Sequence, residues 1–179
     1  MSKLLIVVDY QNDFVAGALG FEAARALEDP IADMVKQVLA EGGRVLFTRD
    51  THQPDYLNTR EGKFLPVPHC IKGTDGWHLY GRLAAYESIT LPGITILDKP
   101  TFGSAQIAPA SRTLCGGDPE EILICGVVTN ICVVSNAIVL HTNFLNSRIT
   151  VLQDLCAAPD PADHQNALRL LAGMGYHIQ

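Results

Sequence analysis

The chain has 179 residues, of which 47% are hydrophobic and 18% are charged, a composition typical of a folded domain and not of a disordered chain. Its formal net charge of −6 argues against electrostatic binding of nucleic acid. No apolar stretch reaches the roughly 18 residues that a membrane span requires, so no membrane partner is expected. The length predicts one domain with a sizeable core, covering residues 1–179.

The N-terminal segment, MSKLLIVVDYQNDF, is interpreted as a first strand and not as a signal peptide. One lysine precedes a short apolar run, and that run stops at an aspartate. The five cysteines form no CxxC pair, so we expect reduced thiols in a cytoplasmic protein.

Short apolar runs rich in Val, Ile and Leu recur along the chain and predict buried strands. They cover residues 4–9, 44–50, 94–98, 121–127, 148–153 and 176–178. Helical patterns lie between most of them, at residues 30–40, 130–140 and 162–172. Strands that alternate with helices predict a three-layer α/β/α fold of Rossmann-like type, with a doubly wound, mostly parallel sheet. Residues 51–76 show little periodicity, and a loop of that length is usually functional.

Reactive side chains stand at the carboxyl ends of the predicted strands. Asp9 ends the first strand, Asp50 ends the second, Lys99 follows the third, and Cys132 comes shortly after the fourth. In an open parallel sheet, ligands bind beyond these ends. The sequence therefore predicts that carboxylates, an amine and a thiol converge at one edge of the sheet.

Cys132 lies in the first turns of a predicted helix, within ICGVVTNICVVSNA. Free N–H groups at a helix start favour anions and would lower the pKa of the thiol, which suits a nucleophile. The alternative is a packing role, because cysteine is among the residues most often buried. Asp9 could act as general base and acid, or it could cap a turn. Lys99 could stabilise negative charge on sulfur, or it could be a solvated surface lysine.

The second strand leads into a group of candidate metal ligands. Asp50 and His52 lie on the same side of an extended segment, and Glu61 and His69 follow. Two imidazoles and two carboxylates suit zinc, manganese or iron, although a D-x-H pair alone does not define a site. The phosphate-binding patterns GxGxxG and GxxxxGK[ST] do not occur, nor does the serine-hydrolase pattern GxSxG.

Four segments carry a resemblance to a known family. In chain order they are LLIVVDYQNDF, TRDTHQPDYLNTREGKFLPVPHCIKGTDGWHLYGRL, LDKPTFGSA and GVVTNICVVSNA. Together they resemble the isochorismatase-like cysteine hydrolases, and within these the nicotinamidases, over nearly the whole chain. The part of the second segment that reads HCIKGTDGWHLYGRL is particularly close to the nicotinamidase pattern.

The resemblance implies an enzyme that hydrolyses nicotinamide to nicotinic acid and ammonia in NAD salvage, with pyrazinamide as a further candidate substrate. In this reading Asp9 is the general base, Lys99 steadies the ion pair, and Cys132 forms a thioester. The resemblance also implies a cis peptide bond between Val127 and Val128, and an oxyanion hole made by the N–H groups of Val128 and Cys132. Self-association into a homo-oligomer is consistent with the family.

The resemblance further implies a divalent metal, with zinc as the first candidate and manganese or iron as alternatives. It would receive the pyridine nitrogen of the substrate and orient the ring. Its implied ligands are Asp50, His52, Glu61 and His69. The implied aromatic walls of the substrate pocket are Phe14, Phe64 and Phe102, with Leu65 as an alternative to Phe64.

Three other interpretations stay open at this point. The first is a cysteine hydrolase of the same fold that acts on a ureido or carbamoyl amide and needs no metal. The second is a vinyl-ether hydrolase, a chemistry that does not require Cys132. The third is a catalytically silent binding protein, which would have no need of Asp9, Lys99 and Cys132 together.

Overall fold

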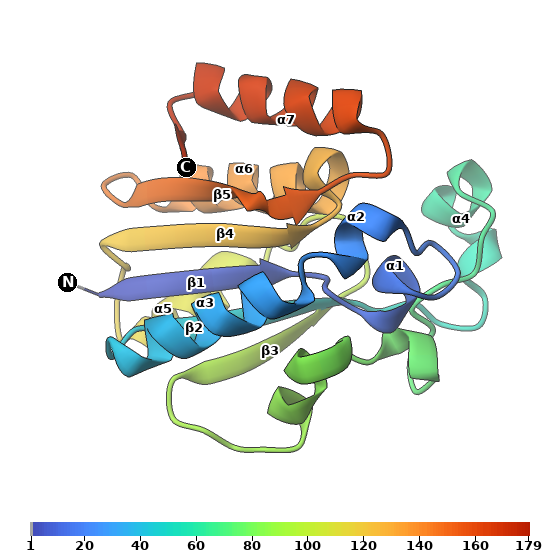
Figure 1. Ribbon diagram of the computed structural model, residues 1–179, viewed down its shortest axis with the longest axis horizontal. Coiled ribbons are helices and arrows are strands. Elements are labelled where there is room, and N and C mark those ends of the chain that lie inside the picture. The colour runs from blue at the N-terminus through green and yellow to red at the C-terminus, as the bar shows by residue number, and fades with distance from the viewer. Residues whose placement is uncertain (1) are drawn as a thin grey trace.

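The computed structural model describes residues 2–179, and its centre is one parallel sheet (Figure 1). The strands are β1 (Lys3–Val8), β2 (Arg44–Asp50), β3 (Ile94–Lys99), β4 (Glu121–Val127), β5 (Arg148–Ala157) and β6 (His177–Ile178). Their order across the sheet is β3-β2-β1-β4-β5-β6, and every neighbouring pair is parallel. The predicted doubly wound α/β fold is therefore confirmed, and the main difference is that β5 continues four residues past the predicted end at Gln153.

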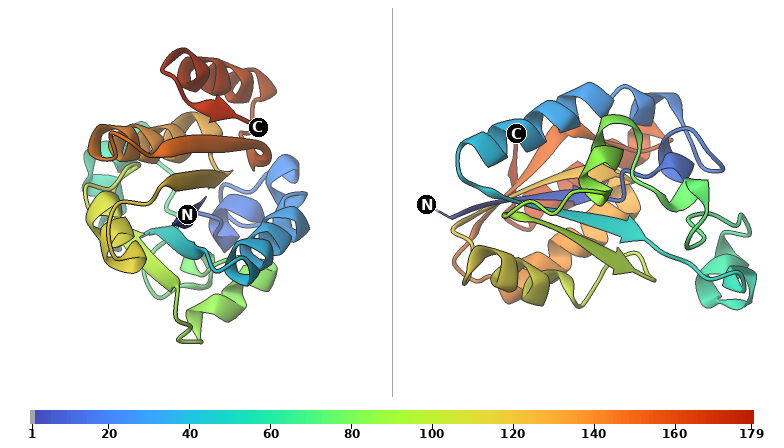
Figure 2. Two further views of the ribbon diagram at one scale, coloured as in Figure 1. Left: turned by 90° about the vertical axis from the view of Figure 1, so that its left-hand side faces the viewer. Right: turned by 90° about the horizontal axis from the view of Figure 1, so that it is seen from below.

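Helices cover both faces of the sheet, because its central strands are apolar on both sides. Residues Leu4 to Val8 of β1 are all fully buried, which requires cover above and below. Helix α3 (Glu28–Ala40) packs on one face, and α5 (Ile107–Cys115) and α6 (Val134–Asn143) lie on the other (Figures 1 and 2). Helix α7 (Pro161–Gly173) packs against β5 and β6. No helix within residues 2–179 has the length and apolar character needed to cross a bilayer.

The predicted helix at residues 130–140 consists of two different pieces. Residues Thr129–Val133 form a π-helical turn, in which the Val133 N–H donates to the Val128 carbonyl at 3.2 Å, and α6 begins only at Val134. The correction has a physical basis, since the sequence pattern gives the apolar face but not the hydrogen-bond spacing. Such π-helical turns occur frequently at functional sites.

The long segment after β2 contains short helices that the sequence pattern does not show. They are η1 (Tyr56–Asn58), α4 (Arg60–Phe64), η2 (Asp75–Trp77) and η3 (Gly81–Glu87), and two more, α1 (Asn12–Val15) and α2 (Glu22–Arg25), follow β1. The Thr59 hydroxyl caps α4 by accepting from the Gly62 N–H at 2.9 Å. In Figure 1, α1 and α4 lie beyond the arrowheads of the strands. Helices α1 and α4 therefore stand where an open sheet binds its ligands.

Candidate active site

The candidate site lies where β1 and β4 run side by side, because the strand order reverses between them. The chain turns sharply after both strands. Asp9 has a φ of 47°, and its N–H donates to the carbonyl and the hydroxyl of Thr48, both at 3.2 Å. Gly126 has a φ of +113°, and a Cβ atom there would lie 2.2 Å from the Val8 carbonyl oxygen. Any side chain at this position would clash with that oxygen, so the turn requires glycine.

The peptide bond between Val127 and Val128 is cis, as the family resemblance implies. Together with the π-helical turn, this segment brings Cys132 to the edge of β1. Lys99 reaches the same place from β3. Its Nζ is 2.6 Å from Asp9 Oδ2 and 3.8 Å from Cys132 Sγ, and it donates to the Thr101 carbonyl at 3.0 Å.

All three side chains of this group are almost fully enclosed. Asp9 and Lys99 are 0% exposed, and Cys132 is 3% exposed. The other oxygen of Asp9, Oδ1, accepts a hydrogen bond from the Thr48 hydroxyl at 2.6 Å. Asp9, Lys99 and Cys132 therefore meet in space as the strand ends predict, and Lys99 is not a solvated surface lysine.

The electrostatics of this group follow from its burial. Burial raises the pKa of the Asp9 carboxyl, while the charge of Lys99 opposes that rise. Burial also raises the pKa of the Cys132 thiol well above its ordinary value, against the opposing charge of Lys99. For Lys99, burial works against the charge, but Asp9, Cys132 and Asp50 together raise its pKa. The expectation of a lowered thiol pKa is thus wrong, because desolvation outweighs the position near a helix start.

A second group of side chains, the donor set, consists of Asp50, His52, Glu61 and His69. One ligand atom from each lies within 4.8 Å of all the others. His52 Nε2 is 2.9 Å from Asp50 Oδ2 and 3.4 Å from Glu61 Oε1, and His69 Nε2 is 3.4 Å from Asp50 Oδ2. The four implied metal ligands therefore come together.

The donor set fits a divalent metal by two further observations. Glu61 Oε1 is buried, and apart from its 3.4 Å approach to His52 Nε2 it has no hydrogen-bond partner among residues 2–179, so a cation would complete its surroundings. His69 Nδ1 lies 2.7 Å from the Val67 carbonyl oxygen, a contact that fixes the ring with Nε2 toward the other donors. Two nitrogen and two oxygen donors suit zinc, manganese or iron.

Asp50 connects the two groups. Its Oδ2 faces His52 and His69, while its Oδ1 is 3.5 Å from Lys99 Nζ. Burial opposes the charge of Asp50, but Lys99 and the two histidines hold the pKa of its carboxyl well below the ordinary value. The donor set and the group formed by Asp9, Lys99 and Cys132 are thus parts of one site.

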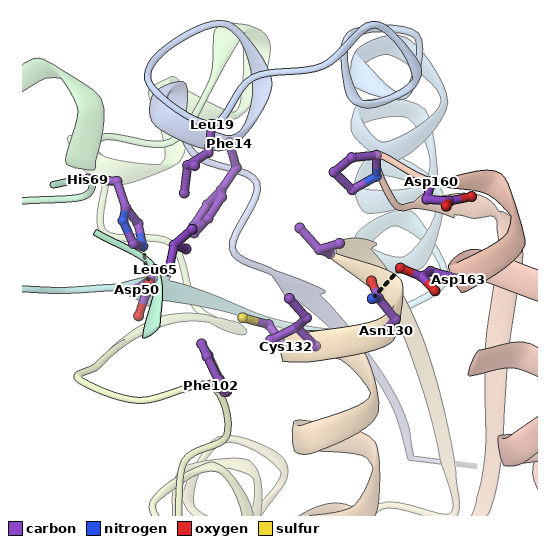
Figure 3. A pocket seen from close by; sticks show the side chains of 13 residues that line it. Phe14, Leu19, Asp50, Leu65, His69, Phe102, Asn130, Cys132, Asp160 and Asp163 are labelled. Atoms are coloured by element: carbon purple, nitrogen blue, oxygen red, sulfur yellow. Dashed lines mark hydrogen bonds and ion pairs between the residues drawn. The ribbon is translucent and has the colours of Figure 1, made fainter. Parts of the chain in front are cut away.

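A cavity of about 280 Å³ lies between the two groups (Figure 3). It is lined by Phe14, Leu19, Asp50, Leu65, His69, Phe102, Val128, Asn130, Ile131, Cys132, Pro159, Asp160 and Asp163. Most of these side chains are apolar, and the Cys132 thiol and the His69 ring stand on different sides of the space in Figure 3. This arrangement suits a small, flat ligand with one polar group at each end.

The structure places two of the three expected aromatic walls at this cavity. Phe14 and Phe102 line it, and the Phe14 ring meets the His69 ring edge to face at 5.3 Å. Phe64 does not line it, because this residue ends α4 and is 82% exposed; Leu65 takes that place. Phe64 instead borders a separate hollow that Phe102 also lines.

The isochorismatase domain family matches residues 3–179 of this chain. The chain is also 31% identical over 173 residues to PncA of Bacillus subtilis, described as an uncharacterized isochorismatase family protein, and the match covers 94% of this chain and 93% of that one. The chain belongs to the isochorismatase family.

Two solved structures extend this comparison within the isochorismatase family. The pyrazinamidase/nicotinamidase of Streptococcus mutans superimposes with a TM-score of 0.86 at 33% identity, covering 99% of this chain and 100% of that one. The pyrazinamidase of Pyrococcus horikoshii in complex with zinc gives a TM-score of 0.80 at 25% identity, covering 100% and 99%. The similarity therefore extends over the whole fold.

Two supporting residues of this isochorismatase-family site are missing from the sequence interpretation. The Gln11 side chain accepts from the Asp50 N–H at 2.7 Å and donates to the carbonyls of Asp50 and Trp77 at 2.9 and 2.7 Å. Asp13 accepts from the N–H of Cys70, the residue after His69, at 2.7 Å. Both lie in the DYQNDF segment. The sequence feature that points to them is this run of polar residues directly after a fully buried strand.

Proposed function

We propose that the chain hydrolyses nicotinamide to nicotinic acid and ammonia through a thioester on Cys132. The observation that carries this proposal is the shared cavity, which has the thiol and the donor set at different sides of one small apolar space. A carboxamide at Cys132 would leave the ring nitrogen facing the donor set. The activities named for the Streptococcus mutans and Pyrococcus horikoshii proteins support the same substrate class.

The first half of the reaction needs only groups that already meet. Asp9 takes the thiol proton while the Cys132 sulfur attacks the carboxamide carbon, and Lys99 stabilises the negative charge that develops. The raised pKa of Asp9 suits this role, since a stronger base accepts a proton more readily. The N–H groups of Val128 and Cys132 are proposed to hold the oxyanion. Asp9 then passes its proton to the leaving nitrogen, the C–N bond breaks, and ammonia departs.

The second half reverses the proton transfers. Asp9 removes a proton from a water molecule that attacks the thioester carbon. The C–S bond breaks, the carboxylic acid forms, and the proton returns to the sulfur of Cys132. Each turnover therefore consumes one water and restores both the thiol and the ion pair between Asp9 and Lys99.

The donor set would hold the metal outside this proton path. A divalent ion bound by Asp50, His52, Glu61 and His69 would supply a Lewis-acid position for the pyridine nitrogen and so orient the ring. Phe14 and Phe102 would enclose the ring from the sides. We propose zinc as the ion, in keeping with the zinc complex of the Pyrococcus horikoshii protein.

An ammonia-release assay with nicotinamide tests the proposal, using protein purified without chelator and the same protein after chelation. We expect release by the first sample, loss on chelation, and recovery when zinc is added. Nicotinamide left intact by protein that holds one metal per chain would refute the substrate. Release from a ureido amide by metal-free protein would instead favour the alternative cysteine hydrolase.

A further inference from the structure

The loop between β3 and α5 supplies two parts of the proposed site. The Thr101 carbonyl accepts from Lys99 Nζ at 3.0 Å, so the loop helps to hold the ammonium group beside Asp9 and Cys132. The next residue, Phe102, forms a wall of the cavity. The position of this loop relative to the Cys132 turn therefore sets both the placement of the Lys99 charge and the width of the cavity.

Asn136 ties the loop to the Cys132 turn. It lies on α6, four residues after Cys132, and is 0% exposed. Its Nδ2 donates to the Cys132 carbonyl at 2.9 Å and to the Phe102 carbonyl at 3.1 Å, and its Oδ1 accepts from the Ser104 N–H at 3.0 Å. Both amide hydrogens and the carbonyl are thus used, and every partner belongs either to the loop or to the nucleophile.

The backbone of the loop also approaches α6 closely beside the contacts of Asn136. Gly103, in the middle of the loop, faces Ser135, the residue before Asn136. A Cβ atom on Gly103 would lie 3.1 Å from both the Cβ and the carbonyl oxygen of Ser135, which is tighter than most Cβ contacts in proteins. The loop therefore lies close against α6 here, and an added methyl group would require a local shift of a few tenths of an ångström.

We infer that Asn136 is a positioning residue for the proposed reaction, one that holds Lys99 and Phe102 in register with Cys132. This inference rests on the proposed function for its kinetic readout. A residue needed only for folding would change stability without changing the turnover of the folded molecules. A positioning residue changes that turnover, because misplacement of reacting groups by about 1 Å costs up to roughly 100-fold in rate.

The test compares Asn136→Leu with a matched change on the same helix. Asn143 makes the same kind of bond, from its Nδ2 to the carbonyl four residues earlier, at 2.8 Å, but it is exposed and lies at the far end of α6. Asn143→Leu is therefore the control. Gly103→Ala is a second variant that disturbs the contact without removing a hydrogen bond. Each protein is loaded with zinc, its metal content is measured, and kcat and KM for nicotinamide are determined.

We expect Asn136→Leu to lower kcat by roughly 10- to 100-fold per metal-loaded molecule, and by more than it changes KM. Gly103→Ala should lower kcat in the same direction by a smaller factor, and Asn143→Leu should match the parent. Parent-like kcat in Asn136→Leu would overturn the inference, whatever its melting temperature. If Asn136→Leu does not fold, the kcat of Gly103→Ala is the test instead. A loss of kcat that only follows a loss of bound metal also refutes the inference.

A second measurement separates this inference from the proposed function. If the parent releases no ammonia from nicotinamide, the substrate proposal fails, and alkylation of Cys132 by iodoacetamide, followed by peptide mass spectrometry, replaces turnover. Alkylation should be slower in Asn136→Leu and Gly103→Ala than in Asn143→Leu, because a displaced Lys99 stabilises the thiolate less. Equal rates in the three variants would refute the positioning role.

Discussion

Replacing Lys99 with methionine would leave two enclosed carboxylates without the cation that they share. Nζ is 2.6 Å from Asp9 Oδ2 and 3.5 Å from Asp50 Oδ1, and the three side chains are at most 1% exposed. At an effective dielectric constant of about 20, the two attractions amount to about 6 and about 5 kcal/mol before desolvation is subtracted. Breaking a buried pair by removing one partner has a net cost of about 3–5 kcal/mol, and we expect this loss for Lys99→Met.

The double variant Asp9→Asn/Lys99→Met should recover much of that loss, because it removes a stranded charge together with its partner. Urea unfolding in the presence of chelator measures both free energies of unfolding without a contribution from bound metal. Lys3→Met is the control, since its Nζ lies 2.7 Å from Glu41 and 3.7 Å from Glu121, but the Lys3, Glu41 and Glu121 side chains are 30%, 43% and 23% exposed. Each of these surface pairs should contribute less than about 1 kcal/mol. A loss in Lys99→Met no larger than in Lys3→Met, or no recovery in the double variant, would refute the reasoning.

Three further changes test other parts of the site and its support. Cys132→Ala should abolish ammonia release while the far-UV circular dichroism stays that of the parent, and retained turnover would refute the thioester. His69→Ala should weaken zinc affinity by at least about tenfold in a titration of metal-free protein, and unchanged affinity would exclude this ligand. For Glu87, burial opposes the charge, but hydrogen bonds from the Leu79 N–H and from Arg49 lower its pKa. The stabilisation by the Glu87 carboxylate is therefore present above its unfolded pKa and is lost as the pH falls through its lower folded pKa. The difference in unfolding free energy between parent and Glu87→Gln, measured by urea unfolding, should shrink on acidification. A difference that does not change with pH would contradict this prediction.

The strands were predictable because burial on both faces leaves near-continuous apolar runs, as in β1. Helix α5 was not predicted, since its sequence, IAPASRTLC, contains Pro109 and only two large apolar side chains, Ile107 and Leu114. The proline is tolerated because it lies in the first turn, where its missing N–H has no partner to lose. The end of β5 was missed because Asp154 interrupts the apolar run.

Much of the candidate site followed from where strands end. Alternation along β3 sends the Asp98 side chain outward to Arg49, at 2.8 Å, and the Lys99 side chain inward. The partners of the supporting residues could not be found in this way, because Gln11 bonds to Asp50 and Asn136 bonds to the loop after β3, both more than thirty residues away in sequence. The direction of the Cys132 pKa shift also depends on depth in the fold, which a local pattern does not give.

The Asp50 carboxylate has a consequence for how the two ends of the cavity influence each other. One of its oxygens belongs to the donor set, and the other faces the Lys99 ammonium group, which lies 3.8 Å from the Cys132 sulfur. A carboxylate shared in this way attracts the ammonium less strongly once its other oxygen coordinates a cation, and more of the positive field then reaches sulfur. Binding of the proposed divalent ion to the donor set is therefore expected to change the reactivity of the Cys132 thiol on the other side of the cavity.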